Sequence, residues 1–281
     1  MKIRLAQVKV VPVKGGLEAN HRRLMRVLAE LAGHRPDVVV TPEGFLDGYI
    51  ATEEEVTRQN IGRYAIDPGA SDYVREAAAW AARHRSWLIL GCSRMTLEGV
   101  TNSALILDRA GELAGVYDKV HLQRHDQKYV AGRALPVYPS DFGPFGVMIC
   151  ADRRWPETVR TLVLKGARVI FNPTYGFHDE KNVRMMCTRS YESEVWIAFT
   201  HPEQALVTGP QGEILLNETS PEATFAVCEL DLDAVDAVRA QESSHLKALR
   251  PDLYECGPAA AEAANGAGEA AAKTMQAAGG G

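Results

Sequence analysis

Short apolar runs rich in Val and Ile alternate along the chain with longer stretches in which apolar residues recur every three to four positions. The run over residues 3–10, for example, is followed by Leu24, Val27, Leu28 and Leu31, a spacing that places all four on one helical face. The apolar runs predict strands and the amphipathic stretches predict helices. Besides the helix around residues 24–31, we predict strands over 3–10, 38–41, 87–92, 102–108, 115–119, 146–150, 169–172, 195–200 and 224–232, and helices over 71–84, 156–165 and 179–194.

This alternation is typical of an α/β layered domain. The runs between residues 87 and 119 follow one another closely and predict antiparallel hairpins rather than βαβ crossovers. One mixed-sheet domain over residues 1–256 accounts for the pattern. Residues 257–281 consist mainly of Ala and Gly and contain no aromatic or β-branched aliphatic residue. We predict a low-complexity, disordered tail there, because such a segment cannot form a core.

The composition narrows the class of protein. The 31 Lys and Arg residues are outnumbered by 36 Asp and Glu, a formal net charge of −5, so bulk charge gives no support for nucleic-acid binding. No run approaches the roughly 18 consecutive apolar residues of a membrane span, and the N-terminal residues show no signal-peptide pattern. We therefore expect a cytoplasmic protein with neither a nucleic acid nor a membrane as partner.

Metal and cofactor motifs are not found. His121 and His125 are four residues apart, as in zinc sites, but they follow a strand and lack the accompanying Glu, so we predict no metal site. No phosphate-binding glycine loop follows a strand. The widely spaced cysteines fit neither a zinc site nor a disulfide framework, and they are Cys92, Cys150, Cys187, Cys228 and Cys256.

Three predicted strands end in residues that can carry chemistry. Glu43 follows the run over 38–41, Lys119 ends the run over 115–119, and Cys150 ends the run over 146–150. In open α/β sheets, ligands bind outside the carboxyl ends of strands. We therefore expect a carboxylate, an ammonium and a thiol to meet at one edge of the sheet.

Cys150 differs from the other cysteines in its surroundings. Pro156 suits the first position of a helix, so the thiol lies at an elbow between a strand and a helix. A helix N-terminus together with the neighbouring Arg153 and Arg154 favours a thiolate. We therefore expect the pKa of the Cys150 thiol to be lowered, as a cysteine nucleophile requires at neutral pH.

Two assignments stay open at this point. A nucleophilic cysteine needs a base, and spacing alone allows Glu43, Lys119 or one of the eight histidines. The arginine pair after the cysteine is suited to bidentate recognition of a substrate carboxylate. The alternative is that these arginines pair with the nearby acids Asp152 or Glu157.

The three strand endings resemble the signature segments of the nitrilase superfamily of carbon–nitrogen hydrolases, in the family order Glu, Lys, Cys. Further likeness to its secondary motifs extends the resemblance over about residues 2 to 235. The matching segments are Pro42-Glu43, Tyr117 to Leu122, Cys150 to Glu157, Asn102-Ser103-Ala104, Asn172-Pro173, and Arg189 with Glu192.

The resemblance implies a four-layer αββα sandwich that commonly dimerises, so we expect a homodimer or a larger homo-oligomer. It implies Cys150 as nucleophile, Glu43 as general base and Lys119 as the group that stabilises the tetrahedral intermediate. The backbone N–H of Ala151 would help to hold the oxyanion. No cofactor is implied.

The sequence Cys-Ala-Asp-Arg-Arg-Trp-Pro-Glu resembles that of N-carbamoyl-D-amino acid amidohydrolases, where the arginines help to bind the substrate carboxylate. This likeness implies that Arg153 and Arg154, with Asn172, contact the substrate. The superfamily also carries a second Glu, and the corresponding position here is His125, followed by Asp126. These two residues are the candidates for a proton relay.

We therefore expect a cofactor-free hydrolase that cleaves a linear amide or N-carbamoyl group of a small, carboxylate-bearing molecule. The reaction would pass through a cysteine thiol ester and release ammonia or an amine. Two alternatives stay open. One is an aliphatic amidase or ω-amidase, and the other is a catalytically weak family member that acts as a binding or interaction protein.

Overall fold

The structure, a computed structural model, describes residues 1–254. Residues Met1–His245 form one compact unit, and a second unit begins at Leu246. Within the described part of the second unit, Pro251–Leu253 form a short 3₁₀ helix. The predicted domain boundary after residue 256 and the Ala/Gly-rich tail over 257–281 lie outside the described residues.

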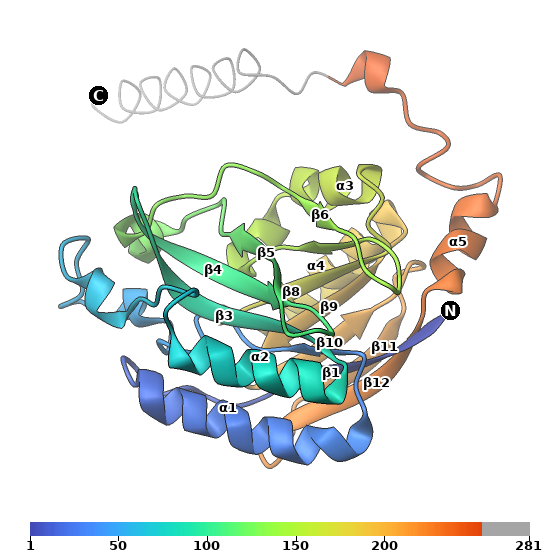
Figure 1. Ribbon diagram of the computed structural model, residues 1–281. Helices are drawn as coiled ribbons and strands as arrows, with labels where there is room; N and C mark the ends of the chain where they lie inside the picture. The colour runs from blue at the N-terminus through green and yellow to red at the C-terminus, as the bar shows by residue number, and fades with distance from the viewer. Residues whose placement is uncertain (255–281) are drawn as a thin grey trace, which may run out of the picture. The chain divides into compact units, whose positions relative to one another are not determined.

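Two six-stranded sheets form the centre of the first unit (Figure 1), ordered β12-β1-β2-β3-β4-β5 and β11-β10-β9-β8-β7-β6. Each has three parallel strands, β1-β2-β3 and β7-β8-β9, extended by antiparallel ones. The first sheet contains β1 (Lys2–Val8), β2 (Val38–Val40), β3 (Trp87–Thr96), β4 (Gly99–Leu107), β5 (Leu113–Asp118) and β12 (Phe225–Asp231). The second contains β6 (Val137–Tyr138), β7 (Phe145–Val147), β8 (Val169–Pro173), β9 (Trp196–His201), β10 (Gln204–Thr208) and β11 (Ile214–Glu218).

Helices cover the outer face of each sheet, which completes the expected four-layer αββα sandwich (Figure 1). The first sheet is covered by α1 (Leu17–Leu31) and α2 (Asp72–His84), and the second by α3 (Pro156–Leu164) and α4 (Glu180–Ser193). A further helix, α5 (Asp233–Ala240), follows β12. None of the described helices is long and apolar enough to cross a membrane.

Strand periodicity explains why two separate cores form. In β2, Val38 and Val40 belong to the core between the two sheets, whereas Val39 belongs to the core between the first sheet and its helices. Successive strand side chains point to opposite faces, so a strand buried on both faces is apolar throughout. The apolar face of α1, with Leu24, Val27, Leu28 and Leu31, packs into the second of these cores, as its spacing predicts.

Each predicted strand and helix is present, with ends that differ by a few residues. The strand predicted over 146–150 ends at Val147, so Cys150 lies beyond it. The hairpins predicted between residues 87 and 119 are confirmed by the antiparallel pairing of β3 with β4 and of β4 with β5. Among the strands and α-helices of residues 1–254, the pattern did not predict β6, β10, β11 and α5, all of them eight residues or shorter.

Candidate active site

The three strand endings come together, but from two sheets rather than from one edge. Glu43 follows β2 and Lys119 follows β5 in the first sheet, whereas Cys150 follows β7 in the second. The expectation of a single sheet edge was wrong, because the sheets pack face to face and bring their strand ends to a common site. Glu43 and Lys119 are fully buried, and Cys150 is 6% exposed.

Glu43 is held by hydrogen bonds on both carboxylate oxygens. Its Oε1 accepts from Lys119 Nζ at 2.7 Å and from Asn102 Nδ2 at 2.8 Å. Its Oε2 accepts from the backbone N–H of Tyr175 at 3.0 Å. Gly91 allows the close approach of this loop, since a Cβ there would lie 2.3 Å from the carbonyl oxygen of Pro42. The carboxylate therefore has one defined position.

Lys119 lies between two buried carboxylates. Its Nζ donates to Glu43 Oε1 at 2.7 Å and to Asp126 Oδ2 at 2.6 Å, and Tyr49 Oη is 3.3 Å away. Burial on its own would lower the pKa of Lys119, but Glu43, Cys150 and Asp126 together raise that pKa above its ordinary value. The site therefore favours the charged form of Lys119.

The two relay candidates have different contacts. Asp126 is fully buried and bonds Lys119, whereas His125 Nε2 lies 2.7 Å from Tyr49 Oη. The Tyr49 hydroxyl donates to Asp126 Oδ1 at 2.8 Å, so all three side chains are connected. The structure thus places the carboxylate of Asp126 beside Lys119, one position after the residue that corresponds to the family's second Glu.

Cys150 begins a 3₁₀ helix, Cys150–Arg154, that leads into α3. Its φ of 45° is in the left-handed region, a strained conformation that is concentrated at functional sites. Asp152 anchors this elbow by accepting from the N–H of Ile149 at 2.9 Å, from Tyr117 Oη at 2.7 Å, and from the N–H and Nδ1 of His121 at 2.8 Å each. The predicted elbow is confirmed. The donors that hold Asp152 from outside the elbow, Tyr117 and His121, come from β5 and the loop that follows it.

The expected lowering of the Cys150 pKa is wrong for the free protein. Burial and the negative charge of Glu43 raise the pKa of the thiol, and they outweigh the opposing effects of Lys119 and Arg153. Loss of solvent disfavours the charged thiolate. The thiol therefore depends on a neighbouring proton acceptor when it reacts.

A cavity of about 300 Å³ opens onto the thiol. A larger and shallower hollow of about 520 Å³ runs along Arg94 and Arg133 and contains no nucleophile, so the smaller cavity is the candidate substrate site. No acidic side chain lines it. Its lining consists of Tyr49, Thr52, Gln123, His125, Cys150, Ala151, Arg153, Arg154, Tyr175, Gly176 and Phe177.

The two arginines after the nucleophile differ in exposure and in partners. Arg153 is fully buried, and Arg154 is exposed with its Nη1 2.6 Å from Gln123 Oε1. Neither guanidinium lies within ion-pair distance of Asp152 or Glu157 in the described chain, so the alternative pairing with these acids is wrong.

Asn172 and Ala151 occupy different surroundings. Ala151 lines the cavity beside the nucleophile. Asn172 is fully buried and donates from Nδ2 to the carbonyl oxygen of Met148 at 3.0 Å. It is absent from the cavity lining, so the geometry gives it the task of holding the chain just before Cys150.

Comparison with known proteins shows which family the chain belongs to. The profile of the family described as carbon-nitrogen hydrolase matches residues 2–240. The chain belongs to this family. Its four-layer sandwich is the fold of a carbon–nitrogen hydrolase of the nitrilase superfamily.

Individual relatives of this carbon–nitrogen hydrolase are distant. A nitrilase from Pyrococcus abyssi is 26% identical over 267 residues, covering 90% of this chain and 98% of the relative. An N-carbamoylputrescine amidase from Arabidopsis thaliana is 26% identical over 187 residues, covering 55% of this chain and 62% of the relative. The crystal structure of a carbon-nitrogen hydrolase from Helicobacter pylori has a TM-score of 0.79 at 20% identity and covers 90% of this chain and 97% of that chain. This similarity is one of fold.

Several residues of the hydrolase site escaped the sequence analysis. Tyr49, Tyr175 and Phe177 line the cavity, and none belongs to a recognisable pattern. Tyr175 and Phe177 do follow the end of β8, so the rule that ligands bind beyond strand ends could have pointed to them. For Tyr49 no such signal exists, because it lies in a long loop after β2.

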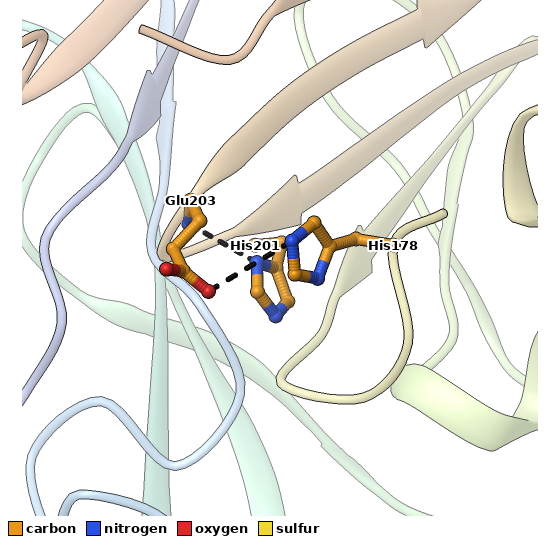
Figure 2. A group of neighbouring side chains, drawn as sticks. All are labelled: His178, His201 and Glu203. Atoms are coloured by element: carbon orange, nitrogen blue, oxygen red, sulfur yellow. Dashed lines mark hydrogen bonds and ion pairs between the residues drawn. The ribbon is translucent and has the colours of Figure 1, made fainter. Parts of the chain in front are cut away.

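A separate group of three side chains places possible metal-ligand atoms within 4.8 Å of one another (Figure 2). The group consists of His178, His201 and Glu203. The two imidazole rings stack with centroids 4.1 Å apart, so their nitrogen lone pairs do not converge on one point. His201 Nδ1 accepts from the N–H of Glu203 at 3.0 Å, and its Nε2 lies 3.3 Å from the carbonyl oxygen of Tyr175. This geometry fits a packing contact behind the cavity better than a metal site. His121 and His125, bonded to Asp152 and Tyr49, do not converge either.

A side chain at Gly176 is expected to disturb the nucleophile. A Cβ there would lie 3.0 Å from Cys150 Sγ, so Gly176→Ala would shift the thiol by a few tenths of an ångström. We expect turnover to fall by at least about tenfold and stability by about 1–3 kcal/mol, the usual cost of overpacking. Steady-state kinetics and denaturant unfolding would measure both. The matched control is Gly33→Ala, where no atom lies within 4 Å of the added Cβ, and equal effects in the two variants would contradict the prediction.

Asp126→Asn is expected to reduce turnover more than His125→Gln. The first change removes a carboxylate from the Lys119 ammonium, and hydrogen bonds to charged groups account for about a tenfold to hundredfold effect. The second removes the hydrogen bond to Tyr49 Oη and the longer contact with Asp126 Oδ1 at 3.7 Å, and it leaves the Lys119–Asp126 pair in place. Parallel measurement of kcat for the two variants tests the assignment, and a larger loss in His125→Gln would reverse it.

Proposed function

We propose that this protein hydrolyses a linear amide or N-carbamoyl group of a small, carboxylate-bearing molecule through a thiol ester on Cys150. The observation that carries the proposal is the buried Glu43–Lys119 pair beside the thiol at a cavity without acidic side chains. Membership of the carbon–nitrogen hydrolases supports the reaction class.

Glu43 is the base in the proposed first step. Of the alternatives, Lys119 is held as an ammonium, and the histidine that lines the described cavity, His125, bonds Tyr49. Glu43 takes the proton of Cys150 as Sγ attacks the substrate carbonyl carbon and the C=O π electrons move to oxygen. Lys119 and the backbone N–H of Ala151 hold the resulting oxyanion.

Collapse of the tetrahedral intermediate re-forms the carbonyl and breaks the C–N bond. The departing nitrogen takes the proton from Glu43, so ammonia or an amine leaves and a thiol ester remains. Glu43, again a carboxylate, then removes a proton from water as the hydroxyl oxygen attacks the thiol-ester carbon. Expulsion of the Cys150 sulfur, with return of the proton, releases the acid product and restores the thiol.

Positive charge at the cavity supports an anionic substrate. Arg154 is exposed, and its only described hydrogen-bond acceptor is the neutral Gln123. A guanidinium in that state can bind a carboxylate through two parallel hydrogen bonds. The carbamoyl group in the name of the Arabidopsis relative supports N-carbamoyl compounds among such substrates, although the arginines favour an anionic rather than a cationic end group.

The test is ammonia release from N-carbamoyl D- and L-amino acids, simple amides, ω-amides and nitriles. We expect release from N-carbamoyl amino acids by the wild type. Release from ω-amides or simple amides alone would replace the proposal with an amidase activity. If a protein shown to be folded released no ammonia from any compound in the panel, the alternative of a binding or interaction protein would be favoured.

Arg154→Gln is expected to raise KM for a carboxylate-bearing substrate by about tenfold or more, because a charge-assisted contact is lost. The value of kcat should change little, since the described hydrogen bond of Arg154 goes to Gln123 and not to Glu43, Lys119 or Cys150. The matched measurement uses the corresponding neutral amide or ester of the substrate. An equal rise in KM for the neutral compound would contradict the role of Arg154.

A further inference from the structure

The geometry points to Arg153 as a catalytic residue that stabilises the Cys150 thiolate, and not as an anchor for the substrate carboxylate. The two consecutive arginines would then have separate tasks, Arg153 at the sulfur and Arg154 at the substrate. The effect on turnover rests on the proposed function, but the effect on the thiol does not.

All three nitrogens of the Arg153 guanidinium have partners. Nε donates to Asn182 Oδ1 at 2.8 Å, and Nη2 donates to the carbonyl oxygen of Phe177 at 2.8 Å. Nη1 donates to Cys150 Sγ at 3.5 Å, a normal distance for a bond to sulfur. These bonds use three of the five N–H donors of the guanidinium, and the one from Nη1 reaches the reacting sulfur. The side chain is therefore oriented toward the sulfur.

The positive charge of Arg153 is buried without a negative partner. Its exposed fraction is 0%, and no carboxylate in the described chain lies within ion-pair distance of it. The rings of Phe177 and Phe199 lie 4.5 and 5.2 Å from the guanidinium carbon and stabilise it only in part. Burying an unpaired charge is costly, so the site favours an anion at the neighbouring atom. That atom is Cys150 Sγ.

The contact matters at two points in the reaction. When Glu43 takes the thiol proton, negative charge develops on Sγ and the hydrogen bond from Nη1 becomes charge-assisted on both sides. In the thiol ester the sulfur is neutral, and the bond weakens. When the second tetrahedral intermediate collapses, the C–S electron pair returns to sulfur and the same bond stabilises the departing thiolate. Arg153 therefore acts on both formation and hydrolysis of the thiol ester.

Asn182→Asp offers a nearly isosteric test of this role. It places a carboxylate on Nε of Arg153, and the Nδ2 atom that it replaces has no hydrogen-bond partner in the described structure. Asn182 lies in the first turn of α4, where an acidic side chain is favourable. The variant should therefore fold. Its new carboxylate should offset the positive charge of Arg153 and so reduce the electrostatic effect of that charge on Cys150 Sγ. Arg153→Met removes the charge directly.

The readout is the rate of alkylation of Cys150 by iodoacetamide as a function of pH, followed by mass spectrometry of the digested protein. We expect both variants to slow alkylation at neutral pH by about tenfold or more, as for loss of a hydrogen bond to a charged group. Their alkylation profiles should move to higher pH. Cys187, in the same sample, is the internal control and should be unaffected.

A double-mutant cycle separates action through Arg153 from a direct effect of the new carboxylate. If Asn182→Asp acts through Arg153, adding it to Arg153→Met should change alkylation little further. Unchanged alkylation in both single variants would overturn the proposal, as would a loss confined to KM for carboxylate-bearing substrates. If the wild type released no ammonia from any compound but the variants still slowed alkylation, the proposed function would fail and the role of Arg153 would stand.

Discussion

Cys150→Ala is expected to abolish turnover and leave the fold intact. The change removes the thiol that lines the described cavity, and a thiol is a small group whose loss costs about 1 kcal/mol of burial. Alanine also places no bulk near Gly176 or Arg153, the neighbours of the sulfur. Ammonia release and denaturant unfolding of the purified variant measure the two halves of this prediction.

The matched control is Cys228→Ala. Cys228 lies on β12, packed against the core between the sheets and away from the cavity lining. This variant should keep wild-type turnover with a comparable change in stability. Turnover by Cys150→Ala at the wild-type rate would rule out a thiol-ester mechanism on this residue.

Lys119→Met is expected to lower turnover by on the order of 10²-fold or more and to destabilise the protein by about 3–5 kcal/mol. The first effect follows from loss of a group that holds the oxyanion. The second arises because Glu43 and Asp126, both fully buried, would remain without the ammonium between them. Kinetics and equilibrium unfolding measure the two effects separately.

Adding Asp126→Asn to Lys119→Met distinguishes these causes. Removal of one uncompensated carboxylate should restore part of the lost stability, since Asp126 no longer needs a cation. Activity should not recover, because the oxyanion still lacks its ammonium. Recovery of turnover along with stability would show that Lys119 is structural rather than catalytic.

The three candidate catalytic residues could be predicted from the sequence because each of them follows a predicted strand. Glu43, Lys119 and Cys150 each follow an apolar run, and these runs form β2, β5 and β7. The second sheet was predicted from the resemblance to the nitrilase superfamily. Periodicity alone could not predict it, because an apolar run does not reveal which sheet the strand joins. The fold class, the family and the placement of the three side chains at strand ends were therefore accessible from sequence.

The partners of these side chains were not accessible in the same way. Asp126 and His125 are adjacent in the chain, yet only Asp126 reaches Lys119. Arg153 and Arg154 are adjacent as well, and burial separates their roles. Neither difference has a signal in the local sequence.

The Cys150 thiol shows the physical reason most clearly. The sequence by itself determined the elbow and the basic neighbours, which alone favour a lowered pKa. Only the tertiary structure decided the burial and the nearby negative charge of Glu43 that raise this pKa. Local periodicity and residue chemistry are properties of the chain, whereas burial and charge at an atom are summed over segments that meet only on folding, here residues from both sheets and the loops between them.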